Sequence, residues 1–332
     1  MLTRRLLTYL ALSLVTMFSC ARKESKPSSL ELPDRGSILI AVNQYVEHPN
    51  LALVFEGFKE TVDSWGKVHG VEVRYDRKIA GADASVATQI ARQQISANPR
   101  LILALATPSA QAAARVNTTV PIVFGAITDP VAAGLVKSLA APGGNVTGSS
   151  DIGPYRRQFE LIRKLLPAAK TVGVIRNPGE SNSVSSMALI DPAIQRAGFK
   201  KIEASVATTS EVLAAARSLV GRCDLFYMPA DNTVLSALPA VAGVCDSNKI
   251  PLFVGDEGSV DLGAAATIGI DYYQLGRATG EIATRILNGE SPAKIPVAFG
   301  TADRVVVNLE AAKKQGVQFP TEVLKGAKVL KQ

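Results

Sequence analysis

Polar and acidic residues in this 332-residue chain follow apolar stretches of the kind that form β-strands. In the first half of the chain the candidate site residues are Gln44, Glu47, His48, Thr107, Ser109, Thr128 and Asp129. In the second half they are Asn182, Ser183, Asp231, Asn232, Asp256, Asp271 and Tyr272. Hydroxyl and amide groups can hold an anion, and carboxylates can hold a cation. Because an amino acid carries both charges at a fixed separation, this pattern predicts a site for a small zwitterionic ligand.

Two pairs of these residues are candidates for binding a carboxylate. Thr107 and Ser109 precede the expected start of a helix, so their hydroxyls and the neighbouring amides can hold an anion. Asn182 and Ser183 should face them from the second half of the chain. Turn formation around residues 178–179 explains the local turn, but it does not explain the Asn-Ser pair that follows.

Helix capping is an alternative role for all of these polar residues, Thr107 and Ser109 included, because Ser, Thr, Asp and Asn are preferred N-caps. Asp129, next to Thr128, either accepts a hydrogen bond from an ammonium group or caps a helix that begins at Pro130. His48 is either a ligand contact or a structural histidine. We expect one or two of the following residues to contact the ammonium group and the rest to cap helices: Asp231, Asn232, Asp256 and Asp271. The tyrosines that either stack on an aromatic ligand or belong to the core or rim are Tyr45, Tyr155, Tyr272 and Tyr273.

The elements that must position these residues alternate between strands and helices. Short β-branched or aliphatic runs predict strands at 38–42, 72–76, 101–106, 122–126, 171–176, 201–207, 225–229, 252–254 and 267–270. Helical spacing of apolar residues predicts helices at 52–65, 85–97, 155–166, 212–219 and 274–287. Apolar strands separated by helices indicate parallel sheets covered on both faces. The order occurs twice, which predicts two doubly wound, Rossmann-like α/β lobes with a ligand cleft at the carboxyl ends of their strands.

The N-terminus has the pattern of an export signal. Arg4 and Arg5 precede an apolar stretch, residues 6–18, that is short for a membrane span. Cys20 resembles the cysteine at which bacterial lipoproteins are cleaved and acylated, and residues 20–36 have the composition of a flexible tether. We therefore expect residues 1–19 to be removed and the protein to be lipid-anchored in the cell envelope, outside the cytoplasm. The alternative is an ordinary secretory signal followed by an incidental cysteine.

Two cysteines remain in the folded part of the chain. Cys223 opens an expected strand, and Cys245 ends the helix that follows it. Because a helix in a βα unit runs back antiparallel to its strand, the two thiols should lie near the same end of the unit. They form either a disulfide in an oxidising compartment or two buried free thiols.

The composition disfavours several classes of function. The 36 Lys and Arg residues are scattered, with no run of five or six and no interleaved aromatics, so nucleic-acid binding is poorly supported. The chain has two histidines and no metal-ligand cluster, and it lacks the glycine-rich nucleotide fingerprints and the Gly-x-Ser-x-Gly elbow of hydrolases. We therefore expect no enzymatic activity, no cofactor and no metal.

Seven stretches of the chain carry a resemblance to a known family: residues 47–49, 106–111, 128–130, 142–148, 177–183, 231–233 and 271–277. Across residues 38–318 the sequence is similar to the substrate-binding proteins of ABC transporters, in the family that includes tryptophan/tyrosine-type binding proteins. Asn50 and Ala52 differ from the alanine and aspartate that we expect after the Glu-His-Pro motif. This difference predicts an altered side-chain pocket with an unchanged polar clamp.

The resemblance implies a type I periplasmic-binding-protein fold in which the chain crosses between two lobes three times. Residues 37–150 with 271–300 would form lobe 1, and residues 151–270 with 301–332 would form lobe 2. It also implies a monomeric substrate-binding lipoprotein of an ABC importer, which closes its cleft on an amino acid, such as Trp, Tyr or Phe, and docks on permease subunits. The alternatives are a ligand-sensing lipoprotein that signals to a partner and an enzyme on the same fold.

Overall fold

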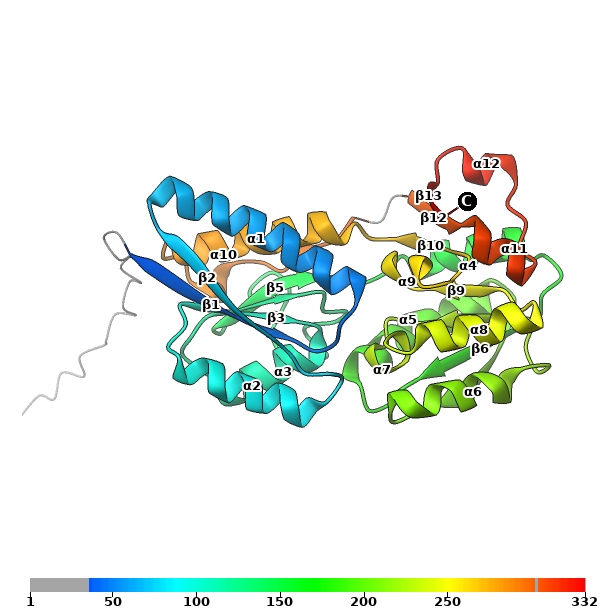
Figure 1. Cartoon of the computed structure of the whole chain (residues 1–332), viewed down its shortest axis with the longest axis horizontal. Helices are drawn as coiled ribbons and strands as arrows, with labels where there is room; N and C mark the ends of the chain where they lie inside the picture. The colour runs from blue at the N-terminus through cyan, green and yellow to red at the C-terminus, as the bar shows by residue number, and fades with distance from the viewer. Residues whose placement is uncertain (1–35, 302–303, 332) are drawn as a thin grey trace, which may run out of the picture.

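The computed structural model describes residues 36–301 and 304–331, which form two α/β lobes joined side by side (Figure 1). The order of elements in each lobe alternates between strands and helices, as the apolar runs of the sequence predict. The expected signal at 1–19, the cysteine at position 20 and most of the expected tether lie outside the described residues. In the part of the chain that is described, no helix is long and apolar enough to cross a membrane.

The first lobe is built on a six-stranded sheet with the order β11-β5-β4-β3-β1-β2, in which every strand pairing is parallel. Its strands are β1 (Ser37–Gln44), β2 (Glu72–Ile79), β3 (Leu101–Leu105), β4 (Ile122–Gly125), β5 (Val146–Ser150) and β11 (Ala298–Phe299). Its helices are α1 (Pro49–His69), α2 (Ala84–Ser96), α3 (Thr107–Val116) and α10 (Tyr272–Leu287), with a 3-10 turn at Pro292–Lys294. Helices α1 and α10 cover one face of the sheet, and α2 and α3 cover the other (Figure 1).

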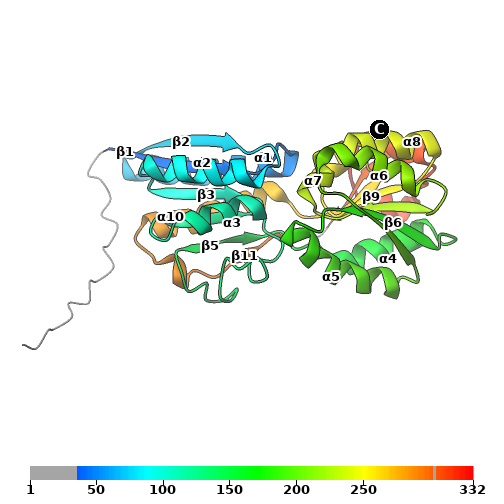
Figure 2. The same cartoon turned by 90° about the horizontal axis from the view of Figure 1, so that it is seen from below.

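The second lobe is built on a seven-stranded sheet with the order β13-β12-β10-β9-β8-β6-β7. Its strands are β6 (Thr171–Arg176), β7 (Lys200–Ser205), β8 (Leu225–Met228), β9 (Leu252–Val254), β10 (Ala266–Gly269), β12 (Arg304–Asn308) and β13 (Lys328–Lys331). Only the β10–β12 pairing is antiparallel. The central strands β8, β9 and β10 are buried on both faces because helices pack against each side (Figure 2).

The helices of the second lobe vary widely in length. The longer ones are α4 (Tyr155–Leu165), α5 (Ser181–Arg196), α6 (Val212–Leu219) and α8 (Leu238–Asn248). The shorter ones are α7 (Asn232–Leu235), α9 (Gly258–Asp261), α11 (Leu309–Gln315) and α12 (Thr321–Leu324), with a 3-10 turn at Thr209–Glu211. Helices α4 and α5 lie on one face of the sheet, and α6 and α8 lie on the other (Figure 2).

The chain leaves the first lobe and later returns to it, and this return distinguishes the architecture from two consecutive domains. After β10 it returns to the first lobe, where α10 packs along α1 and β11 pairs with β5. It then passes to the second lobe, where β12 pairs with β10. Residues 302–303, within this last crossing, lie outside the described residues.

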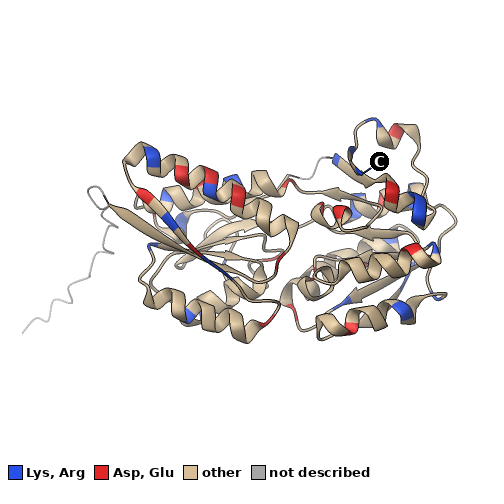
Figure 3. Cartoon of the chain, viewed as in Figure 1, with Lys and Arg blue, Asp and Glu red and all other residues tan. Residues whose placement is uncertain are grey.

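Two glycines allow α1 and α10 to touch backbone to backbone. A Cβ atom added at Gly57 on α1 would lie 2.2 Å from the carbonyl oxygen of Tyr273, and one added at Gly276 on α10 would lie 2.3 Å from that of Val54. Charged residues of both signs occur along these helices (Figure 3). The close contact fixes the start of α1 against the start of α10, and both starts border the site described next.

Candidate functional site

A cavity lies between the lobes, at the carboxyl ends of strands from both sheets. It is partly open to solvent. The first lobe and the crossings contribute Val46, His48, Asn50, Leu51, Ala106, Thr107, Ala126, Thr128, Asp151 and Tyr272. The second lobe contributes Asn182, Ala230, Asn232, Leu235 and Asp256.

Two long helices, one from each lobe, begin at this cavity without a side-chain cap. Helix α3 begins at Thr107 and α5 begins at Ser181, next to Asn182. The residue before each helix, Ala106 or Glu180, makes no side-chain capping hydrogen bond in the described structure. Gln111 of α3 donates a hydrogen bond across the lobes to Ser181 Oγ of α5 (3.2 Å). Uncapped helix N-termini carry free amide donors and a partial positive charge, so both can bind an anion. On the α5 side the available donors are backbone amides, because the Asn182 side-chain amide already donates to Glu180 Oε2 (3.1 Å) and to the Ala230 carbonyl (2.9 Å).

The backbone before α3 is held in an unusual conformation. Ala106 and Ala126 follow β3 and β4, and both have positive φ angles, 73° and 58°. Such φ angles are uncommon for a residue with a Cβ atom and concentrate at functional sites. Both alanines line the cavity, so these strained turns direct the start of α3 and Thr128 toward it.

Asp151 is a buried carboxylate at the point where the chain first passes from the first lobe to the second. It follows β5 and accepts hydrogen bonds from Tyr272 Oη (3.1 Å) and Thr128 Oγ1 (3.4 Å). Burial raises the pKa of Asp151 to about 6, although the hydrogen bond from Tyr272 acts in the opposite direction. No basic side chain forms an ion pair with it among the described residues. A ligand cation would supply the missing positive charge.

Asp256 is a second carboxylate in the cavity wall, and protein groups occupy both of its oxygens. Its Oδ1 accepts from Asn50 Nδ2 across the lobes (2.6 Å) and from the Ser259 amide (2.9 Å), while its Oδ2 accepts from Ser259 Oγ (2.7 Å). His48 Nε2 lies 3.3 Å from Ser259 Oγ. Burial lowers the pKa of His48, which favours the neutral imidazole. Asp256 thus joins the lobes instead of presenting a free charge.

The rest of the cavity wall is apolar. Val46, Leu51 and the two strained alanines line it from the first lobe, and Ala230 and Leu235 line it from the second. Ligand sites commonly combine such walls with a few well-placed polar groups. The arrangement suits a molecule with a carboxylate, an ammonium group and an apolar side chain.

Comparison with known proteins places the chain in a family. The family model described as "ABC transporter substrate binding protein" matches residues 39–331. The chain belongs to this family. As a member of it, the protein is an ABC transporter substrate-binding protein with a type I periplasmic-binding-protein fold, which its distant structural neighbours share.

Three relatives of this substrate-binding protein are informative. The tyrosine-binding protein of Clostridioides difficile is 39% identical over 279 residues, which are 84% of this chain and 81% of the relative. A structure from Streptococcus pneumoniae in complex with L-Trp is 32% identical, with a TM-score of 0.84, and the match covers 89% of this chain and 100% of that one. The ligand-free, open structure of a substrate-binding protein with adhesive properties from Clostridium difficile is 37% identical, with a TM-score of 0.66, over 89% of this chain and 99% of that one.

The L-Trp complex and the ligand-free, open structure differ in how well their lobe arrangement matches that of this chain. The chain agrees better with the L-Trp complex than with the ligand-free, open form, although it is slightly less identical to the former in sequence. The direct hydrogen bonds from Asn50 to Asp256 and from Gln111 to Ser181 join the two lobes. The described structure is therefore a closed arrangement of the binding protein.

Seven of the fourteen residues expected from the sequence line the cavity: His48, Thr107, Thr128, Asn182, Asn232, Asp256 and Tyr272. Two others, Gln44 and Glu47, lie in a separate groove outside the cavity mouth, where Arg77 donates to Gln44 Oε1. Of the residues in the cavity, His48 also caps α1, because its Nδ1 accepts from the Asn50 amide (3.3 Å). It therefore combines the two roles that the sequence leaves open.

Three of the residues that the sequence predicts for the site cap a helix or a turn and do not line the cavity. Asp129 accepts from the amides of Val131 and Ala132, and Asp271 caps α10 and lies 3.5 Å from Arg304 Nη2. Asp231 caps α7 and also accepts from the Asn177 amide (2.6 Å). The capping alternative therefore holds for these three in the described structure.

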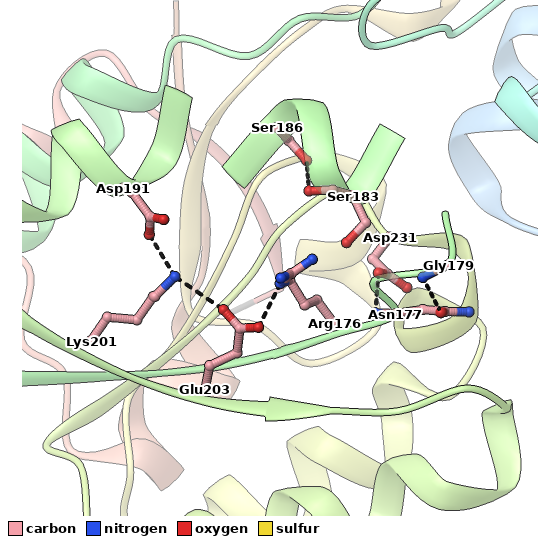
Figure 4. Close-up of polar contacts among 9 residues, drawn as sticks. All are labelled: Arg176, Asn177, Gly179, Ser183, Ser186, Asp191, Lys201, Glu203 and Asp231. Carbon is pink, nitrogen blue, oxygen red and sulfur yellow. Dashed lines mark hydrogen bonds and ion pairs between the residues drawn. The ribbon is translucent and has the colours of Figure 1, made fainter. Parts of the chain in front are cut away.

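The last two expected residues are buried behind the cavity wall. Ser109 donates to Asn43 Oδ1 (2.8 Å) inside the first lobe. Ser183 lies in the first turn of α5, beside Asp231 (Figure 4). Burial and the charge of Glu180 raise the pKa of Asp231. Neither Ser109 nor Ser183 lines the cavity, and the hydrogen bond of Ser109 supports the start of α3, which carries Thr107.

Asp151 and Asn50 are cavity residues that the sequence analysis did not include among its candidates. Asp151 follows a strand in the same way as the other acidic residues, but the glycine-rich approach to β5 suggested only a crossing. Asn50 lies directly after the Glu-His-Pro motif, where it departs from the residue expected for the family. Its position in the first turn of α1 is the feature that could have identified it as a candidate for the site.

Cys223 and Cys245 are both free thiols in the structure. Cys223 is half-buried just before the start of β8, and burial raises its pKa to about 11. Cys245 is fully buried in α8, and burial raises its pKa in the same direction, with a smaller contribution from Asp246. Both thiols are therefore protonated and unreactive at neutral pH in this arrangement.

Proposed function

We propose that the protein captures an aromatic amino acid outside the cytoplasm and delivers it to an ABC importer, tethered to a membrane through an acylated Cys20. The observation that carries the proposal is the pairing of a buried, unpaired carboxylate at Asp151 with the uncapped starts of α3 and α5 in one cavity. A tyrosine-binding relative and an L-Trp complex with the same fold support the ligand class.

Each part of an amino acid has a partner in the cavity. The ammonium group pairs with Asp151, and the carboxylate binds at Thr107 and at the backbone amides that begin α3 and α5. The aromatic side chain occupies the apolar wall around Leu51 and Leu235. The ligand thereby touches both lobes, so the closed state binds it better than the open state does.

The energy needed for closure is modest. Moving an open-to-closed ratio from about 99:1 to about 1:99 requires about 5.5 kcal/mol of differential binding. A hydrogen bond to a charged group contributes about 1.5–3 kcal/mol. Two to four such bonds, made only when the lobes meet, are therefore sufficient. The closed form then docks on permease subunits.

The ligand class is tested by thermal melting of the purified protein with each of the twenty amino acids. We expect L-tryptophan, L-tyrosine or L-phenylalanine to raise the melting temperature by several degrees, because a ligand that binds only the folded state stabilises it by mass action. Aspartate, lysine and glycine should produce no shift. If no aromatic amino acid gives a shift while another class does, the proposed ligand class is wrong.

The affinity for the amino acid should also depend on pH. Asp151 must be ionised to pair with an ammonium group, and its pKa in the ligand-free protein is about 6. Between pH 8 and pH 7 the dissociation constant should stay nearly constant, and below pH 6 it should rise about tenfold per pH unit. Calorimetric titration with L-tryptophan from pH 4.5 to 8 measures this dependence. A flat profile across that range would exclude Asp151 as the partner of the ammonium group.

A further inference from the structure

The nitrogen and the oxygen of the Asn182 side chain are in different situations. Asn182 lies in the first turn of α5, lines the cavity and is only 4% exposed. Its Nδ2 donates to Glu180 Oε2 (3.1 Å) and to the Ala230 carbonyl (2.9 Å). Its Oδ1 is buried and accepts no hydrogen bond from any residue that the structure describes. The side chain therefore offers an acceptor, because its donors are already used.

The neighbours of Asn182 decide which end of its amide is the oxygen. A side-chain amide nitrogen has two hydrogens to donate, and both meet an acceptor here. Turning the amide over would place Oδ1 against the Glu180 carboxylate and the Ala230 carbonyl, with no proton between these acceptors. A buried acceptor without a donor is unfavourable, so Oδ1 is free to take a donor from a ligand.

The start of α7 holds Glu180 in place. Glu180 Oε2 accepts from the Asn232 amide (3.1 Å) and from Asn232 Nδ2 (2.6 Å), and Glu180 Oε1 accepts from the Thr233 amide (2.8 Å) and from Thr233 Oγ1 (2.6 Å). In the described part of the chain no basic side chain forms an ion pair with Glu180. All of these contacts lie within the second lobe, so the orientation of Asn182 does not depend on how the two lobes meet.

We infer that Asn182 Oδ1 accepts a hydrogen bond from the ammonium group of the ligand, and that Glu180 is the positioning residue that orients this oxygen. The inference rests on the proposed function, in which the ligand carboxylate binds at the amides that begin α5. An amino acid carries its carboxylate and its ammonium group on one carbon atom, so the ammonium group lies within reach of Asn182 in the same turn. An ammonium group has three N–H donors, which allows it to bond to Asp151 and Asn182 together.

The role of Asn182 is tested by competition calorimetry with two pairs of ligands, L-tryptophan beside indole-3-propionate and L-tyrosine beside 3-(4-hydroxyphenyl)propionate. The second member of each pair lacks only the ammonium group. Asn182→Ala should raise the dissociation constant of each amino acid at least about tenfold, because a hydrogen bond to a charged group is lost. The dissociation constants of the two propionates should stay within about twofold of their wild-type values.

The positioning role of Glu180 is tested with Glu180→Gln and the same ligands. Both oxygens of Glu180 accept from N–H donors, so the NH2 group of glutamine disrupts the network in either orientation and releases the Asn182 amide to turn over. The affinity for the amino acids should fall to between those of the wild type and Asn182→Ala, with the propionates unaffected. Val184→Ala is the matched control, because Val184 lies in the same turn of α5 but is 51% exposed, and it should bind every ligand as the wild type does.

Two results would overturn the inference and leave the proposed function standing. The first is an Asn182→Ala protein that binds the amino acids as tightly as the wild type does. The second is an equal loss of affinity for the amino acids and the propionates, which would assign Asn182 to the ligand side chain or to the shape of the cavity. A wild type that binds neither amino acid would contradict the proposed function and the role of Asn182 together, so the two failures are distinguishable.

Discussion

Asp151→Asn should weaken binding of L-tryptophan or L-tyrosine by at least about 100-fold while the ligand-free fold remains intact. Removing one partner of a buried ion pair costs about 3–5 kcal/mol. Tyr272 Oη and Thr128 Oγ1 donate to different oxygens of Asp151. The asparagine keeps one oxygen that can accept from Tyr272 Oη, and its amide can donate to the Thr128 hydroxyl in place of the second bond. Isothermal titration calorimetry measures the loss of affinity, and chemical denaturation measures the free energy of unfolding.

The same variant should be as stable as the wild type at pH 7, or more stable, when no ligand is present. The pKa of Asp151 is about 6 in the folded protein, above its value of about 4 in an unfolded chain. The folded state therefore binds more protons than the unfolded state between pH 4 and pH 6. It follows that this group reduces the free energy of unfolding as the pH rises through that range. Asp151→Asn should lack this part of the pH dependence.

Asp129→Asn is the matched control for this experiment. Asp129 lies in the loop after β4, as Asp151 lies directly after β5, but the Asp129 carboxylate caps the following turn and does not line the cavity. Asparagine caps as well as aspartate does, so both affinity and stability should stay close to those of the wild type. Equal loss of binding in the two variants would show that the assignment of contact and cap is wrong.

Gly276→Ala should destabilise the protein by about 3 kcal/mol, the upper end of the usual cost of over-packing. The new methyl group would lie 2.3 Å from the carbonyl oxygen of Val54 and 2.8 Å from its Cα atom. Because these are backbone atoms, no side chain can move aside, and α1 and α10 must separate. Denaturant unfolding monitored by circular dichroism measures the change in the free energy of unfolding.

Gly243→Ala is the control for Gly276→Ala, because it also replaces a glycine within a helix. Gly243 lies in α8 with no atom within 4 Å of an added Cβ, so alanine should stabilise the helix by about 0.5–1 kcal/mol. Opposite signs for the two substitutions are expected. If Gly276→Ala were as stable as the wild type, the tight contact between α1 and α10 would be incorrect, and the placement of Asn50 and Tyr272 beside the cavity would lose its support.

The repeating pattern of strands and helices could be predicted from the sequence because buried parallel strands are apolar throughout. The predicted strand at 171–176 and helix at 212–219 coincide with β6 and α6. The strands β11, β12 and β13 were not predicted. They are short and partly exposed, and their pairing partners lie far away in the sequence, so no local periodicity marks them.

The role of each acidic residue could not be predicted in the same way. Asp231, Asp256 and Asp271 all follow strands and precede helical turns, so their local sequences are equivalent. The structure separates them by what faces each carboxylate: Asp231 and Asp271 cap helices, while Asp256 bonds to Asn50 of the other lobe. Such contacts depend on how two distant sheet edges meet, and a single local motif carries no information about that.

The most direct test of the central claim is calorimetric titration of the purified protein with L-tryptophan and L-tyrosine beside analogues that lack one charge. Tryptamine and tyramine lack the carboxylate, and indole-3-propionate and 3-(4-hydroxyphenyl)propionate lack the ammonium group. We predict that at least one amino acid binds with micromolar or higher affinity and that the corresponding analogues bind at least about 100-fold more weakly. Analogues that bind as tightly as the amino acids would contradict a site that binds both the carboxylate and the ammonium group between the lobes.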